Sequence, residues 1–315
     1  MPIKIVTAVV NNPMFIEIQY HTLKKYLKDG GGGGGDGGGG GGGGGGDGGG
    51  GGAAAQYEFI VFNDAKAFPD YTNDGDITLR AKIEETCHRL GIQCIALANE
   101  HHKLVLSAAE RCADAMNAIL QYQLQHSQED KYLLLDSDMF LIADLDINKY
   151  SAYDCAVVLQ SRSHNINYIW NGIYYFDMAK MKNKALLNWR QGMEDNTDVG
   201  GMMHNWLARQ VAVLPSSEDL RWAAPEKTFH RDSVYFIKHL WSGSWNETEL
   251  PDRLRKWGEL VQFLKEDVRN VGGKFYCEIY DDVFLHYRAG GNWNKEGMGL
   301  HNALTEKLSC VLSYF

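Results

Sequence analysis

Short apolar runs alternate with segments of helical spacing along the first half of the chain. The runs are rich in β-branched residues and leucine, as is typical of buried strands. They cover Ile3–Val10, Phe59–Phe62, Cys94–Leu97 and Tyr132–Leu135. Between them, apolar residues recur with a helical period in Phe15–Leu27, in Thr78–Leu90 and behind the capping-box sequence Ser107–Glu110. This alternation predicts a largely parallel sheet covered by helices.

The second half of the chain has shorter predicted elements. We expect strands at Cys155–Leu159 and Ile169–Phe176, and helices at Met202–Leu207 and Asp252–Val268. A chain of 315 residues is long enough for one large α/β domain. We therefore expect a single domain over residues 1–315, with one half at 1–140 and the other at 141–315.

A low-complexity insert at residues 30–55 interrupts the first half. From Gly30 to Gly52 it is glycine apart from Asp36 and Asp47, and three alanines follow. A phosphate-binding loop needs fixed glycines joined to a particular helix start, and this run has no such pattern. It also lacks the side chains that a core requires. We expect a flexible insert that is dispensable for folding and activity, because loop length costs little once a loop is flexible.

The overall composition narrows the class of protein. A hydrophobic share of 44% and a charged share of 23% are ordinary for a soluble globular domain. The net charge of −9 argues against a nucleic-acid partner. Six scattered cysteines form no CxxC pair, which favours reduced thiols over a zinc or redox motif. No signal-peptide core and no apolar run of about 18 residues is present, so we expect no transmembrane segment and a cytoplasmic location.

The strongest local signal is an Asp-Ser-Asp sequence at the end of a predicted buried strand. Asp136, Ser137 and Asp138 directly follow Leu133–Leu135. Carboxylates at the edge of a core are costly unless they are paired or bind a metal. A hard divalent cation would offset that cost and bridge the phosphates of a nucleotide. A solvated acidic turn remains the alternative, because Asp is common in turns.

A second signal is the segment His286-Tyr287-Arg288-Ala289-Gly290-Gly291-Asn292-Trp293. Imidazole is a good ligand for a transition metal. The glycines after it would let the backbone approach a pyrophosphate, and Arg288 would neutralise phosphate charge. Taken alone, His286 is better explained as an ordinary loop residue near the C-terminus.

Together these two segments resemble the GT-A glycosyltransferases, especially the group of glycogenin and the bacterial lipopolysaccharide galactosyltransferases. The resemblance covers roughly Ile3 to Trp293 and implies a Rossmann-like, mostly parallel sheet flanked by helices, with a smaller acceptor-side region. It implies that Asp136, Asp138 and His286 bind Mn²⁺ or Mg²⁺. Ser137, Gly290, Gly291 and Trp293 would then contact the donor diphosphate. The Lys-Pro usual before the tryptophan is replaced by Gly291-Asn292, so Arg288 is the candidate substitute for the lysine.

Further segments acquire roles through the same resemblance. Asn171 and Gly172 would line the donor sugar, although a tight turn between strands explains them equally well. Asp198 would face the reacting sugar carbon, with helix capping as the alternative. Thr7, Ala8 and Val9 match the contact to the nucleotide base. Asp64, at the end of the second strand, is a candidate base or ribose contact, with a turn role as the alternative.

The function expected from these parts is metal-dependent sugar transfer from a nucleotide-sugar donor to a glycan or other acceptor. The resemblance favours a UDP-linked donor and retention of the anomeric configuration. The nucleotide-binding half would be residues 1–140, and the sugar and acceptor half 141–315. Two alternatives stay open: a sugar nucleotidyltransferase, which also uses paired carboxylates, and a non-catalytic carbohydrate-binding module that uses the tryptophans as platforms. The oligomeric state cannot be predicted.

Overall fold

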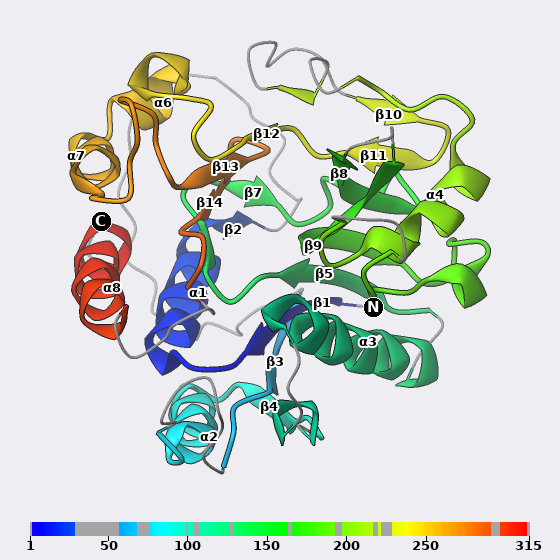
Figure 1. Ribbon diagram of the computed structural model, residues 1–315, viewed down its shortest axis with the longest axis horizontal. Helices are drawn as coiled ribbons and strands as arrows, with labels where there is room; N and C mark the ends of the chain where they lie inside the picture. Colours follow the sequence, from blue (N-terminus) through cyan, green and yellow to red (C-terminus); the bar gives the residue numbers. More distant parts are fainter. Residues whose placement is uncertain are drawn as a thin grey trace, which may run out of the picture.

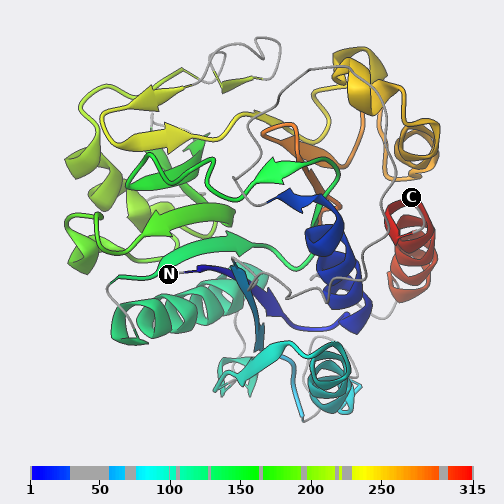
Figure 2. The same cartoon turned by 180° about the vertical axis from the view of Figure 1, so that it is seen from behind.

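The computed structural model describes residues 2–28, 57–67, 76–98, 100–103, 107–126, 129–162, 166–192, 197–216, 220–221, 229–290 and 297–313. The glycine insert, Gly291 and Trp293 lie outside these ranges. Figures 1 and 2 show a mixed α/β arrangement in which α1 (Pro13–Tyr26) stands between the main sheet and the C-terminal helix α8 (Met298–Ser313). No helix in the described ranges is long and apolar enough to cross a membrane.

Within the described residues, the main sheet has eight strands. In spatial order they are β10 (His230–Arg231), β11 (Val234–Phe236), β8 (Cys155–Arg162), β9 (Ile166–Asp177), β5 (Lys131–Leu135), β1 (Ile3–Val9), β3 (Tyr57–Asn63) and β4 (Gln93–Ala96). Four of the neighbouring pairs are parallel and three are antiparallel. The prediction of a largely parallel α/β sheet is therefore confirmed, and the antiparallel pairs all involve the second half of the chain.

Helices cover both faces of this sheet, because side chains alternate between the faces along each buried strand. Leu133 and Leu135 of β5 pack in one core with α1 and with α2 (Leu79–Leu90). Leu134, between them, packs in the opposite core with α3 (Ala108–His126) and α4 (His204–Gln210). A central strand that is apolar on both faces is the expected result of such a sandwich.

A second sheet continues directly from the first. Its strands, in order, are β12 (His239–Leu240), β13 (Glu278–Tyr280), β14 (Phe284–His286) and β6 (Met139–Leu141). A third core joins it to α1, α6 (Asp252–Arg255), α7 (Gly258–Glu266) and α8. Since β6 follows β5 after only three residues, the segment Asp136–Asp138 is the link between the two sheets.

The remaining elements are short. A two-stranded sheet pairs β2 (Leu27–Lys28) with β7 (Leu145–Asp146). The 3-10 helices are η1 (Glu100–Lys103), η3 (Lys184–Leu186), η4 (Gly201–Met203) and η5 (Glu247–Glu249).

Local capping signals in the sequence are borne out, whereas one predicted helix is wrong in its extent. The amide of Glu110 donates to Ser107 Oγ (3.1 Å) and the amide of Ser107 to Glu110 Oε2 (2.7 Å), which is the predicted capping box. The helix predicted over Asp252–Val268 is instead two helices, α6 and α7, separated at Trp257, whose ψ of 89° is not helical. Val268, the last residue of that predicted helix, lies outside α7 and its side chain is 74% exposed.

Candidate functional site

The Asp-Ser-Asp segment forms a tight turn between the two sheets. The amide of Ser137 donates to Asp136 Oδ1 (2.7 Å) and that of Met139 to the Asp136 carbonyl (3.1 Å). Gln19 of α1 donates its side-chain amide to the carbonyls of Asp136 (2.7 Å) and Met139 (3.1 Å). The turn is thus held from both sides, and Asp138 is buried while Asp136 stays partly exposed.

His286 meets this turn because β14 is antiparallel to β6, which places His286 opposite Met139 in the register. Its Nε2 lies 3.1 Å from Asp138 Oδ1. Its Nδ1 lies 2.8 Å from Oε2 of Glu278, which also accepts a hydrogen bond from the Tyr280 hydroxyl (2.7 Å). The structure therefore brings together the three residues predicted as metal ligands, whose ligand atoms all lie within 4.8 Å of one another.

The charges of this group show a shortage of positive charge. Burial and then the charge of Asp138 raise the pKa of Asp136 to about 7. Burial lowers the pKa of His286, but the carboxylates of Asp138 and Glu278 raise it more, to about 10. The imidazole contacts Asp138 and Glu278, and Arg288 Nε lies 3.7 Å from Glu278 Oε1, so two cationic side chains face three carboxylates. A divalent cation would supply the missing charge, as a buried carboxylate pair requires.

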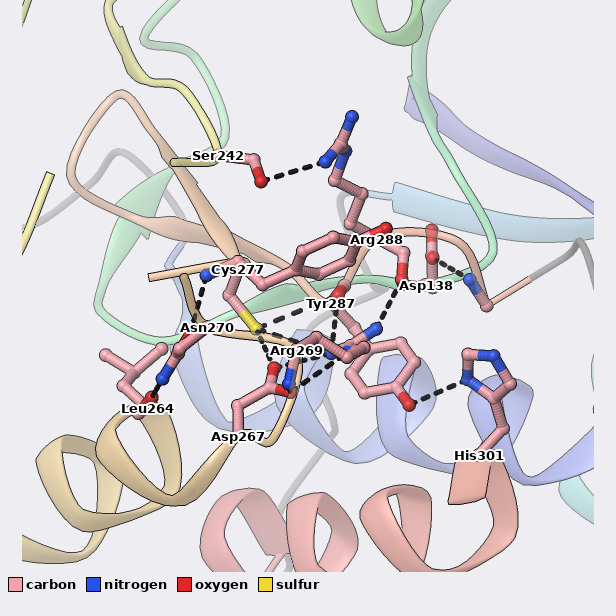
Figure 3. Close-up of polar contacts among 12 residues, drawn as sticks. Asp138, Ser242, Leu264, Asp267, Arg269, Asn270, Cys277, Tyr287, Arg288 and His301 are labelled. Carbon is pink, nitrogen blue, oxygen red and sulfur yellow. Dashed lines mark hydrogen bonds and ion pairs between the residues drawn. The ribbon is translucent and has the colours of Figure 1, made fainter. Parts of the chain in front are cut away.

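The segment after His286 wraps around Asp138 (Figure 3). The amide of Tyr287 donates to the Asp138 carbonyl (2.9 Å), and that of Gly290 donates to Asp138 Oδ2 (2.7 Å). To make this turn, Arg288 and Ala289 adopt left-handed backbones with φ of 66° and 60°, a conformation that is uncommon outside glycine. Such strain persists only where the surroundings enforce it.

Arg269 is the residue that enforces this loop conformation (Figure 3). Its guanidinium donates to the carbonyls of Tyr287 (3.1 Å) and Arg288 (2.9 Å). It is held in turn by Asp267, whose two carboxylate oxygens accept at 2.8 and 2.7 Å. The loop that closes the Asp138 side of the site is therefore anchored to the segment that follows α7.

A bulge in β9 positions Asn171 and Gly172, which lie within this strand and not in a tight turn. The register with β8 shifts between Val157 and Val158, and the Gly172 carbonyl accepts from the amide of Asp136 (2.7 Å). A Cβ on Gly172 would lie 2.1 Å from the Trp170 ring, so only glycine fits. Asn171 is buried, with its side-chain amide 3.5 Å from Cys112 Sγ.

A cavity of about 360 Å³ opens beside His286. Its lining includes Trp170, Asp198, Trp241, Glu278, His286 and Arg288. Asp198 accepts from the amide of its neighbour Val199 (2.8 Å), and its other oxygen lies 3.9 Å from Arg162. The helix-capping alternative for Asp198 is wrong, because the N-cap residue of η4 is Gly200 and no side chain caps this helix. The Asp198 side chain is 44% exposed and faces the same cavity as His286. A carboxylate, an imidazole and aromatic walls around one cavity suit a polar, ring-shaped ligand.

The residues predicted to contact the nucleotide lie at the carboxyl end of β1, which pairs with β5, and just after β3, on the other side of β1. Thr7 and Val9 are buried and Ala8 is partly exposed. The amide of Asp64 donates to the Val9 carbonyl (2.9 Å). The Asp64 carboxylate is buried against two imidazoles, His101 and His102.

Several site residues escaped sequence reasoning. Glu278 and Tyr280 join the site only because β13 pairs with β14, and Trp241 follows β12, which pairs with the other side of β13. A glutamate within the apolar run Cys277–Tyr280 was the signal available for Glu278, because a buried carboxylate needs a partner. Arg162 and Trp170 carry no comparable signal in the sequence.

Comparison with known proteins finds a likeness to solved galactosyltransferase structures. No family model and no curated protein matches the chain. The structure is similar to that of the galactosyltransferase LgtC in complex with donor and acceptor sugar analogues, with 12% identity, 56% of this chain and 59% of that chain covered, and a TM-score of 0.32. An active-site mutant of LgtC gives 12% identity, 58% and 61% coverage and a TM-score of 0.35. The chain spans less than two thirds of these structures.

Proposed function

We propose that this protein is a metal-dependent glycosyltransferase that moves a sugar from a nucleotide-sugar donor to a glycan or other acceptor. One observation carries the proposal. Each predicted ligand has one atom held by the surrounding protein: Asp136 Oδ1 accepts from Ser137, Asp138 Oδ2 from Gly290, and His286 Nδ1 contacts Glu278. The opposite atoms of Asp138 and His286 face each other at 3.1 Å, and a cation would bind between them in place of that contact. Histidine ligands oriented by a carboxylate are a recurrent feature of metal sites.

The donor set fits a divalent ion that accepts both oxygen and nitrogen. Two carboxylates and an imidazole suit Mn²⁺. Mg²⁺ is the second choice, because it prefers oxygen ligands and one of the three ligands is a nitrogen. When bound, such an ion would act as a Lewis acid toward the leaving diphosphate.

The protein's own groups would carry the other parts of the reaction. Arg288, which donates to Ser242 Oγ (2.8 Å) and lies 3.7 Å from Glu278, lines the cavity and is our candidate to neutralise the diphosphate. Asp198 would stabilise positive charge at the sugar carbon, with Asn171 and Gly172 beside the donor sugar. We assign Gly290, Gly291 and Trp293 to the diphosphate side of the donor.

The nucleotide would lie over the ends of β1 and β3, as ligands do at the carboxyl ends of strands in open α/β sheets. Thr7, Ala8 and Val9 are our candidates for the contact to the base, and Asp64 for a contact to the ribose. We propose a UDP-linked donor and retention of the anomeric configuration, both on the sequence resemblance.

A donor screen with two readouts tests the proposal. The protein is incubated with a panel of nucleotide-sugars, with and without Mn²⁺, and released nucleoside diphosphate and pyrophosphate are measured. We expect nucleoside diphosphate, released only with the metal, and none from Asp138→Asn. Pyrophosphate release would instead identify a nucleotidyltransferase. Donor binding without any turnover would identify a carbohydrate- or nucleotide-binding module.

A further inference from the structure

A second group of metal-ligating side chains lies apart from the Asp136 site. The Nε2 atoms of His101 and His102 lie 3.1 and 3.0 Å from the same oxygen, Asp64 Oδ2. His102 Nε2 is also 2.9 Å from the Asp64 carbonyl. One ligand atom from each of the three side chains lies within 4.8 Å of the others.

This group shares no residue with the first site and belongs to different elements. Asp64 directly follows β3, and the two histidines lie in η1, ahead of α3. In the sheet, β1 separates β3 from β5, the strand that leads to Asp136. The two groups therefore stand at the ends of different strands.

The side chains of this group do not satisfy one another. Asp64 is 1% and His102 3% exposed, yet Asp64 Oδ1 and His102 Nδ1 have no hydrogen-bond partner among the described residues. Two imidazoles directed at one carboxylate oxygen compete for the same acceptor. Buried polar atoms without partners are rare in folded proteins. A cation would relieve the competition at Asp64 Oδ2 and would take Oδ1 as well if the carboxylate bound through both oxygens, whereas a water would serve His102 Nδ1.

We propose that Asp64, His101 and His102 bind a divalent transition-metal ion, with zinc as the best match. Tetrahedral zinc with ligand distances near 2.0–2.1 Å has ligand atoms about 3.3 Å apart. The observed separations of 3.1 and 3.0 Å from Asp64 Oδ2 to the two imidazole nitrogens need little adjustment. The His101 side chain is 10% exposed, so we assign the fourth position, on its side, to a water molecule.

The ligand types separate this site from the first. Two imidazoles and one carboxylate favour zinc, whereas two carboxylates and one imidazole suit manganese or magnesium. The ion would tie the end of β3 to the segment that leads into α3, and binding only to the folded state would raise stability. This inference does not rest on the proposed sugar transfer.

The decisive experiment removes the first site and measures zinc at the second. The parent is the full chain carrying Asp138→Asn and His286→Ala, dialysed against zinc and analysed for bound metal by mass spectrometry. We expect one bound zinc per chain. Adding His101→Ala should weaken zinc binding by at least about tenfold. Removing a residue that only orients a ligand already costs about that much, and His101 is itself a proposed ligand. Adding His126→Ala, an exposed histidine at the end of α3, should leave it unchanged.

His101 is the chosen variant because it is the least buried of the three ligands and leaves the Asp64 carboxylate in place. The His101→Ala variant also separates zinc binding from the ribose contact proposed for Asp64, because that contact does not require His101. Circular dichroism verifies that each variant is folded, and an increase of Tm with zinc concentration, absent in the His101→Ala variant, is the second readout. A parent that retains no zinc, or a His101→Ala variant that binds zinc as the parent does, overturns the proposal.

Discussion

The backbone amide of Gly290 donates a 2.7 Å hydrogen bond to Asp138 Oδ2, across 152 residues of sequence. The contact fixes one oxygen of the carboxylate and turns the other, Oδ1, toward His286. It requires a very close approach of backbone to side chain, because a Cβ on Gly290 would lie 2.6 Å from the Phe15 ring and 2.8 Å from Asp138 Oδ2. The proposed metal site therefore requires glycine at position 290.

Gly290→Ala is expected to lower both stability and metal affinity. Overpacking of this kind costs about 1–3 kcal/mol, and here the atoms displaced include a proposed ligand. Thermal unfolding and Mn²⁺ titration measure the two effects. Gly299→Ala is the matched control, since an added Cβ there meets nothing within 4 Å. A Gly290→Ala variant with the Tm and Mn²⁺ affinity of the wild type would contradict the role given to this contact.

Asp138→Asn is expected to lose nearly all metal-dependent turnover while the protein stays folded. Asparagine has the same shape and keeps an oxygen to accept from Gly290, but it removes the charge needed for a cation. Asp138 is buried rather than exposed on a loop, so the conservative amide is the variant to use. Steady-state kinetics with and without Mn²⁺ test this, with the exposed Asp144→Asn as control. Activity that survives in Asp138→Asn, or in chelator, would rule out the metal mechanism.

Glu278→Gln is expected to weaken Mn²⁺ binding by about 10–100-fold, the usual effect of removing an outer-shell partner. Glu278 acts on the ion only through His286, so it is a positioning residue. Isothermal titration with Mn²⁺ measures the affinity, and saturating metal should restore much of the activity. A loss of turnover that excess Mn²⁺ does not restore would point to direct contact with substrate instead.

Asp198→Asn is expected to reduce kcat by about 10²–10³-fold, as removal of one electrostatic stabiliser does. The amide keeps the oxygen that accepts from Val199, and the side chain is 44% exposed, so stability should hold. Mn²⁺ affinity should also stay unchanged, because Asp198 is not one of the clustered ligands. Unaltered kcat in this variant would show that Asp198 has no part in catalysis.

Stability is expected to fall as the pH drops from about 6.5 to 4, in part through His239. Burial lowers the pKa of His239 to about 4, and the ring is 3% exposed. Between the unfolded pKa of about 6.5 and the folded value, the unfolded chain binds more protons, so protons favour unfolding. At about 1.4 kcal/mol per pH unit, this group accounts for about 3 kcal/mol.

Urea unfolding at several pH values tests this dependence. His239→Gln should flatten the slope over this range relative to wild type, whereas the exposed His126→Gln should not. Equal slopes for wild type and His239→Gln would show that other groups carry the acid sensitivity.

The sequence by itself determined the features that depend on neighbours along the chain. The strands of the first half, the Ser107–Glu110 capping box and the Asp-Ser-Asp turn after β5 follow from hydrophobic period and from hydrogen bonds between residues three or fewer positions apart. The break between α6 and α7 was missed because the apolar period of Asp252–Val268 continues across Trp257, where the backbone leaves the helical region.

Only the tertiary structure decided how the site is assembled. The sequence resemblance predicted that His286 would join Asp138, but the pairing of β14 with β6 that brings them together is a long-range register. Glu278 behind His286, the β9 bulge that places Gly172 against Asp136, and the His101–His102 group around Asp64 had no local signal that specified them. Each of these features depends on which distant strands become neighbours. The pairing of the strands is decided by the burial of all the apolar faces of the chain together, and no single segment specifies it.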